Sequence, residues 1–148
     1  MSEKYDLFIN KDKTTSYCFR NTGNPIVCVN ITGSTNAGEI NVAVEVLRST
    51  SSLVKTKPEG IVYKNVNIWV GTSGFATPRN IKEATIVFKV LNSWMSDNNV
   101  KGSDVKMLKW DGSRWIDRET VEKSKDGTHT YFEAKTDTFS NFAISVLK

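Results

Sequence analysis

The sequence predicts an all-β fold, an antiparallel β-sandwich of immunoglobulin-like or related Greek-key topology. Apolar and polar side chains alternate along most of the chain, which is typical of strands with one buried face. Turn signals such as Asp111-Gly112-Ser113 and Asp126-Gly127 recur between these stretches. Roughly nine or ten short strands separated by such turns favour a sandwich over other architectures.

The alternation locates the strands in chain order. An early pair flanks the turn signal Thr22-Gly23-Asn24-Pro25. In the next expected strand, residues 39–47, Ile40, Val42 and Val44 share one face while Asn41 lies on the other. The later expected strands cover residues 61–70, 85–91, 104–110, 114–116, 128–134 and 142–147.

Only residues 92–98 predict a helix, because capping residues begin this segment and turn residues end it. We expect two turns or fewer. The 148 residues show no internal repeat and no break in composition, so we expect a single domain over residues 1–148. Residues 1–14 are a leading strand or an extension. The longest loops, residues 49–60 and 71–80, are where a sandwich would carry a binding function.

Composition limits the partners. The 20 basic and 16 acidic side chains give a net charge of +4, but the basic residues are scattered, so we expect no nucleic-acid partner. No run of 18 apolar residues is present, so we expect no membrane-spanning segment. The first residues also lack the pattern of a signal peptide. Either the chain is cytosolic, or it is a piece whose export signal lies upstream.

The two cysteines, Cys18 and Cys28, flank the first turn. If the flanking strands pair so that these cysteines face each other, Phe19 faces Val27, and one register aligns both the apolar residues and the thiols. This predicts a cross-strand disulfide, which would imply an oxidising compartment. The alternative is two unlinked cysteines that act as small hydrophobic residues, with the two strands in different sheets.

The triplet Asn30-Ile31-Thr32 is the one N-glycosylation sequon, and its parity places Asn30 on the outer face. We therefore treat Asn30 as a candidate glycosylation site.

No constellation typical of an enzyme is present. The single histidine, His129, alternates within an expected strand, and the carboxylates show no paired spacing. Gly71-Thr72-Ser73-Gly74 lacks the lysine and the helix of a phosphate-binding loop. We therefore expect no catalytic residue and no cofactor. We also expect no metal site, because two cysteines and one histidine supply too few ligands.

The tryptophans Trp69, Trp110 and Trp115 are candidates for a sugar-binding platform. Trp110 and Trp115 flank the Asp111-Gly112-Ser113 turn, so they can lie close together across a hairpin. A carbohydrate-binding module predicts at least two coplanar, exposed rings. The favoured alternative is that these rings pack in the core or across strands.

From about residue 15 to residue 148 the chain resembles the PGF-pre-PGF domain of surface proteins from methanogenic and related archaea. The resemblance rests on several blocks in the same order: Asn36–Ile40, Val62–Gly71, Gly74–Thr77, Asn80–Thr85, Val90–Met95, Lys109–Trp115, Tyr131–Ala134 and Thr138–Ile144. The sorting tail of such proteins is absent here, and the net charge is positive although many members look acidic.

The resemblance implies an extracellular or cell-surface location, with the export signal outside this chain, and it supplies no catalytic residue. The expected function is a non-enzymatic structural or adhesive module of an archaeal cell envelope, associated with an S-layer or anchored at the surface. The expected partners are other envelope proteins or domains of a parent chain, surface glycans, and further copies of the chain paired through exposed sheet edges. The alternative function is carbohydrate binding through exposed tryptophans.

Overall fold

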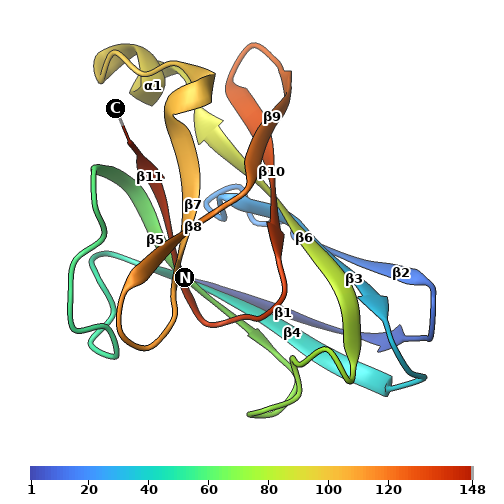
Figure 1. Ribbon diagram of the computed structural model, residues 1–148. Helices are drawn as coiled ribbons and strands as arrows, with labels where there is room; N and C mark the ends of the chain where they lie inside the picture. The colour runs from blue at the N-terminus through green and yellow to red at the C-terminus, as the bar shows by residue number, and fades with distance from the viewer. Residues whose placement is uncertain (148) are drawn as a thin grey trace.

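The computed structural model describes residues 1–147 and shows an antiparallel β-sandwich, as the alternation predicts (Figure 1). One sheet has six strands in the order β1-β4-β5-β11-β7-β8, and the other has five in the order β2-β3-β6-β10-β9. All neighbouring strands are antiparallel. The elements in chain order are β1 (Ser2–Ile9), β2 (Thr14–Cys18), β3 (Ile26–Gly33), β4 (Gly38–Leu47), β5 (Ile61–Val70), β6 (Ile81–Leu91), α1 (Asn92–Asp97), a 3-10 turn (Gly102–Asp104), β7 (Val105–Trp110), β8 (Trp115–Arg118), β9 (Thr120–Lys125), β10 (His129–Thr136) and β11 (Asn141–Val146).

Two of the observed strands, β9 and β6, differ clearly from the expected ones. β9 was not predicted, because its single apolar residue, Val121, is exposed and gives no alternation. β6 begins at Ile81 rather than at residue 85, since Ile81 and Ala84 already face the core. In residues 1–14, the expected alternative of a leading strand is confirmed: β1 is followed by the turn into β2.

The core lies between the two sheets and is built from the apolar sides of all the strands except β8 and β9. Phe88 of β6 and Phe132 of β10 are directly opposite in register, fully buried, and stacked with ring centroids 5.2 Å apart. Burying a side chain of this size stabilises the fold by about 1.5–3 kcal/mol. From the six-stranded sheet, the inward residues include Val44, Ile68 and Phe142. These positions are the apolar half of the alternation on which the fold prediction depends.

Tyr17 connects the two sheets from within the core. It is fully buried on β2, and its hydroxyl donates hydrogen bonds to the carbonyl oxygens of Leu7 at 3.1 Å and Ile40 at 2.8 Å. Burial raises the pKa of Tyr17 to about 12, so the hydroxyl keeps its proton and remains a donor. The edge strand β1 is thereby held against the five-stranded sheet.

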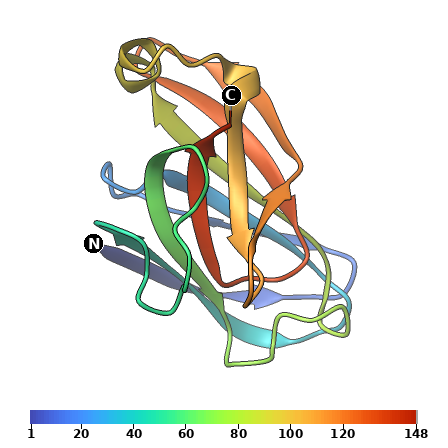
Figure 2. The same cartoon turned by 60° about the vertical axis from the view of Figure 1, so that its left-hand side comes forward.

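The short helix α1 lies at the end of the molecule that also carries the β9–β10 turn (Figures 1 and 2). Met95 is its buried residue, and the Trp94 ring packs edge-on against Tyr63 of β5 with centroids 4.8 Å apart. The helix therefore closes one end of the sandwich. No helix in residues 1–147 is long and apolar enough to cross a membrane.

Candidate functional site

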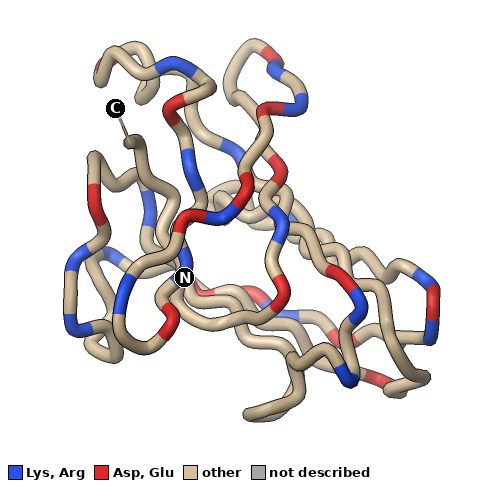
Figure 3. The backbone as a smooth tube through the Cα atoms, in the orientation of Figure 1, with Lys and Arg blue, Asp and Glu red and all other residues tan. Residues whose placement is uncertain are grey.

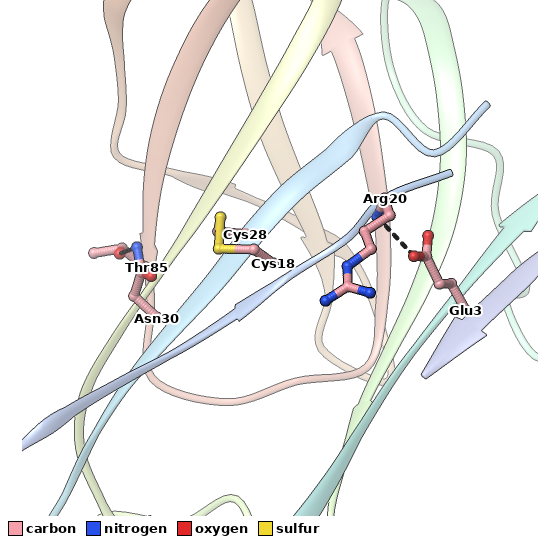
Figure 4. Close-up of a disulfide and its surroundings, with 6 residues drawn as sticks. All are labelled: Glu3, Cys18, Arg20, Cys28, Asn30 and Thr85. Atoms are coloured by element: carbon pink, nitrogen blue, oxygen red, sulfur yellow. Dashed lines mark hydrogen bonds between the residues drawn. A yellow bond between two sulfur atoms is a disulfide. The ribbon is translucent and has the colours of Figure 1, made fainter. Parts of the chain in front are cut away.

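The first hairpin adopts the register that the sequence predicts. Cys18 on β2 faces Cys28 on β3, and the Phe19 amide donates to the Val27 carbonyl oxygen at 2.8 Å. The two cysteines form a disulfide with their Cα atoms 4.1 Å apart. Cys18 is exposed, so the bond lies on the outer face of the five-stranded sheet and not in the core (Figure 4).

Asn30 lies on the same outer face, beside Thr85 of β6 (Figure 4). Its side-chain amide, the group to which a glycan would be attached, donates to the Thr85 hydroxyl at 3.2 Å. The sequon threonine, Thr32, is turned toward β2, where its hydroxyl pairs with that of Thr14 at 2.8 Å. Glycosylation of Asn30 stays a prediction.

Trp110 and Trp115 come together as expected, but they do not form a coplanar platform. Their rings meet edge to face, at 60° and 5.5 Å between centroids, and Trp110 is only 5% exposed. The Trp115 indole N–H donates to the Thr56 carbonyl oxygen at 2.7 Å. Packing, the alternative to the platform, therefore describes this pair.

The partner of Trp115 belongs to a segment that lies over the outer face of the six-stranded sheet. We call residues 48–60 the strap; it runs from teal to green in Figure 2. Besides the bond to Trp115, the Glu59 carbonyl oxygen accepts the Ser145 hydroxyl of β11. Val54 and Pro58 of the strap are buried. The strap is thus attached to the strands at two points along its second half.

The strap explains why the outer side of β11 and β7 is buried. Ala143, Leu108 and Trp110 are all nearly inaccessible, yet they lie outside the apolar cluster between the two sheets. Ala143 and Leu108 are cross-strand neighbours. A second, smaller apolar layer therefore exists on the outside of the six-stranded sheet.

Beyond the strap, on β4 and β5, the outer face is open and carries Trp69. This ring is 36% exposed, and its indole N–H donates to Glu45 Oε1 at 2.6 Å. Ala43 is its cross-strand neighbour, a small residue that leaves space beside the indole. Of the three tryptophans considered for a platform, only Trp69 is exposed, whereas Trp110 is buried and Trp115 is half-buried.

A chain of side-chain amides supports Glu45. Asn141 of β11 donates to Asn67 Oδ1 at 2.6 Å, and Asn67 in turn donates to Glu45 Oε1 at 3.4 Å. Asn67 and Asn141 are each 6% exposed. Since both amides are buried and bonded, they fix the direction in which the Glu45 carboxylate points.

Trp69 lines two hollows. One, about 630 Å³, lies between Trp69 and the first half of the strap, and is lined by Glu45, Asn67, Arg48 and Leu53 together with hydroxyl side chains of the strap. The other, about 480 Å³, is lined by residues 70–74, Ala76 and Phe139 in addition to Trp69. Each of the two loops expected to carry function, residues 49–60 and 71–80, therefore borders a hollow that this exposed tryptophan also lines.

Asp126 lies in the β9–β10 turn, just before His129 at the start of β10. Asp126 accepts hydrogen bonds from the backbone amides of Thr128 and His129, both at 2.8 Å, and from the Tyr131 hydroxyl at 3.0 Å. These bonds lower the pKa of Asp126, the amide of His129 contributing most. The carboxylate oxygens thus stabilise the β9–β10 turn.

Neither a cluster of like charges nor a set of metal ligands identifies a further site in the described part of the chain. Lys and Arg are distributed over both sheets and interleaved with Asp and Glu (Figure 3). No three residues among His, Cys, Asp and Glu of residues 1–147 are arranged to hold a metal ion.

A scan of the chain against models of protein families gives no match, and searches of curated proteins and of solved structures give none either. The interpretation of the site therefore depends on the chain's own residues.

The sequence pattern identified Trp69 but not its surroundings. Glu45 is an ordinary outward position of an alternating strand, and the strap reads as a polar loop. A signal did exist in the strap: Val54 and Pro58 are apolar residues within a run of Ser, Thr and Lys. Such residues indicate a loop that packs on the domain.

Proposed function

We propose that this chain is a non-enzymatic structural or adhesive module of an archaeal cell-envelope protein, displayed outside the cell. The observation that carries the proposal is the Cys18–Cys28 disulfide on the exposed hairpin. Disulfides persist in oxidising compartments and are rare in the cytosol, where thiols are kept reduced. The resemblance to the PGF-pre-PGF domain, based on the ordered sequence blocks, supports the same location.

The hydrogen bonds around the single histidine, His129, also support a structural role. Around His129 the available carboxylate is engaged by two backbone amides and a tyrosine hydroxyl. A general base is usually oriented by a carboxylate that accepts from its ring, whereas Asp126 accepts from the backbone amide of His129.

A module of this kind interacts with other envelope proteins, with domains of its parent chain or with further copies of itself. The end strands of the two sheets are β1 and β8, and β2 and β9. At β1 the carbonyl oxygens of Leu7 and Phe8 already accept from Tyr17 and Thr15, which protects part of that edge. β9 is exposed along its length after Thr120, so we propose it as the edge for strand pairing.

The test is the intact mass of the protein recovered from separated envelope and cytosolic fractions of the organism that makes it. We expect the protein in the envelope fraction, with Cys18 and Cys28 open to alkylation only after reduction. An additional mass at Asn30 would identify the sequon as occupied. Two free thiols on an unmodified chain in the cytosolic fraction would overturn the proposal.

A further inference from the structure

We propose that the outer face around Trp69 binds a neutral oligosaccharide, with one sugar ring stacked on the indole and the neighbouring hydroxyls held by Glu45 and the strap. This inference does not depend on the envelope proposal, because it stands on the geometry of β4, β5 and the strap. It replaces the tryptophan pair suggested by the sequence with a single ring and a polar wall.

The first argument is the state of the Trp69 ring. Its only hydrogen-bond donor is already satisfied by Glu45 at 2.6 Å, so the exposed part of the indole offers an apolar face to a ligand. The face of an indole carries negative electrostatic potential. It therefore suits the weakly positive C–H groups on one side of a pyranose ring.

The second argument is the chemistry of the larger hollow. Its strap side presents four consecutive hydroxyl residues, Ser49-Thr50-Ser51-Ser52. Hydroxyl groups both donate and accept hydrogen bonds, as do the hydroxyls of a sugar. Glu45 adds a carboxylate acceptor and Arg48 adds N–H donors. The hollow thus combines one aromatic wall with several polar groups, which is the usual composition of a small-molecule site.

The third argument concerns the charge and length of the ligand. The one carboxylate and one guanidinium in the larger hollow cancel, so neither a polyanion nor a polycation is favoured. The second hollow, which Trp69 lines together with Gly71-Thr72-Ser73-Gly74, extends this surface. A chain of several sugar residues fits such a surface better than a single sugar.

The two hollows beside Trp69, together called the groove, are also held in place before any ligand binds. Asn141 and Asn67 fix Glu45, and Trp115 fixes the strap through Thr56. A rigid site loses less conformational entropy on binding. Trp115 is therefore a positioning residue for the groove although it does not line the larger hollow.

The experiment is calorimetric titration of the folded full chain with maltohexaose, cellohexaose, mannohexaose and the hexamer of N-acetylglucosamine. We expect at least one of these neutral oligosaccharides to bind, and the same titration to change the tryptophan fluorescence. Trp69→Ala should weaken binding at least about tenfold. The aromatic contact and the apolar area lost in this variant contribute more free energy than the about 1.4 kcal/mol that corresponds to a tenfold change in Kd. Trp69→Tyr, which keeps a ring, should retain most of the affinity.

Phe8→Ala is the matched control, since Phe8 is also an exposed aromatic residue but lies on the edge strand β1, outside both hollows. This variant should bind as the unaltered protein does. If Trp69→Ala lowers the melting temperature strongly, Glu45→Gln decides instead, and we expect it to weaken binding several-fold in a stable protein.

Two results would overturn the inference: none of the four oligosaccharides binds at millimolar concentration, or Trp69→Ala binds as tightly as the unaltered chain. Binding of an extended Ser/Thr-rich peptide in place of the oligosaccharides would likewise assign the groove to a protein partner.

Discussion

The outer faces of the two sheets differ in what covers them. On the five-stranded sheet, Cys18, Asn30 and Thr85 lie on the outer face, where the disulfide links β2 to β3 (Figure 4). On the six-stranded sheet, the strap buries Trp110 and Ala143 against β7 and β11. One face is stabilised by a covalent bond, and the other by a second apolar layer.

Alternation in the sequence thus identifies a strand, but it does not determine whether the outward face of that strand is exposed to solvent. Every residue of β11 is buried, although Asn141, Ala143 and Ser145 occupy its outward positions. Small and amide side chains at these positions permit the strap to approach closely. The open part of the same face lies around Trp69, beside the first half of the strap.

Removing Trp110 should have the largest effect on the layer under the strap. We expect Trp110→Ala to lower the free energy of unfolding by about 3–5 kcal/mol, because it leaves a cavity in a buried layer. Val121→Ala, at an exposed outward position of β9, should change it by no more than about 0.5 kcal/mol. Chemical denaturation of both variants measures the contrast. If both variants change the free energy of unfolding by the same small amount, the side chains under the strap do not form a stabilising apolar layer.

On the five-stranded sheet, the disulfide should make the next largest contribution to stability. Cys18 and Cys28 are separated by 10 positions, so their bond closes a short loop. Replacing both with alanine should lower the free energy of unfolding by about 2–4 kcal/mol through the greater entropy of the unfolded chain. Melting curves with and without a reducing agent give the measurement. The unaltered protein should respond to the reductant, and the double variant should not.

Trp115→Phe tests the attachment of the strap. The ring can still pack edge to face on Trp110, but the hydrogen bond to Thr56 is lost. We expect a loss of about 1 kcal/mol, together with faster proteolysis or hydrogen exchange within residues 48–60. Uniform exchange across the whole chain, in place of this local change, would contradict the role assigned to Trp115.

The smallest expected effect concerns Glu3, which joins β1 of the six-stranded sheet to the β2–β3 loop. Partial burial raises the pKa of Glu3, but bonds from the Arg20 amide at 2.7 Å, the Tyr5 hydroxyl at 2.6 Å and the Asn24 side chain at 3.1 Å outweigh it, so the pKa is lowered. A lowered folded-state pKa contributes stability that is present above the ordinary value of 4.5 and is lost as the pH falls through the folded-state value.

Denaturation of the unaltered protein and of Glu3→Gln, at neutral pH and below pH 4.5, tests this contribution. The difference in stability between the two proteins should shrink on acidification. Glu39→Gln, an exposed carboxylate of β4, is the control and should follow the unaltered protein. A difference that stays constant with pH would assign the effect of Glu3 to packing.

Much of the fold was predictable because it depends on local pattern. The alternation of Val42 and Val44 located β4, and the turn at Asp111-Gly112-Ser113 located the β7–β8 hairpin. β9 was missed because its residues are almost entirely polar or charged, and its strand form comes from pairing with β10. Tertiary context decides such a strand, and local propensity does not.

The candidate site was less predictable for the same physical reason. Trp69 could be named from its type and its position in a strand, but nothing local distinguishes it from Trp110, which is buried. Their difference arises from the strap, whose path depends on contacts with Trp115 and Ser145, far away in the sequence. Only the assembled sheet shows which tryptophan is left open.

The place of β11 in the six-stranded sheet has a consequence for how the protein is made. β11 lies between β5 and β7 and pairs with both, so β1, β4 and β5 are joined to β7 and β8 only through it. This sheet therefore cannot be completed until residues 141–146 have left the ribosome during synthesis. Completion of the domain is therefore a late, cooperative event, as expected when contacts join distant parts of a chain. A nascent chain that stalls before Asn141 would expose two unfinished sheet edges to the cell.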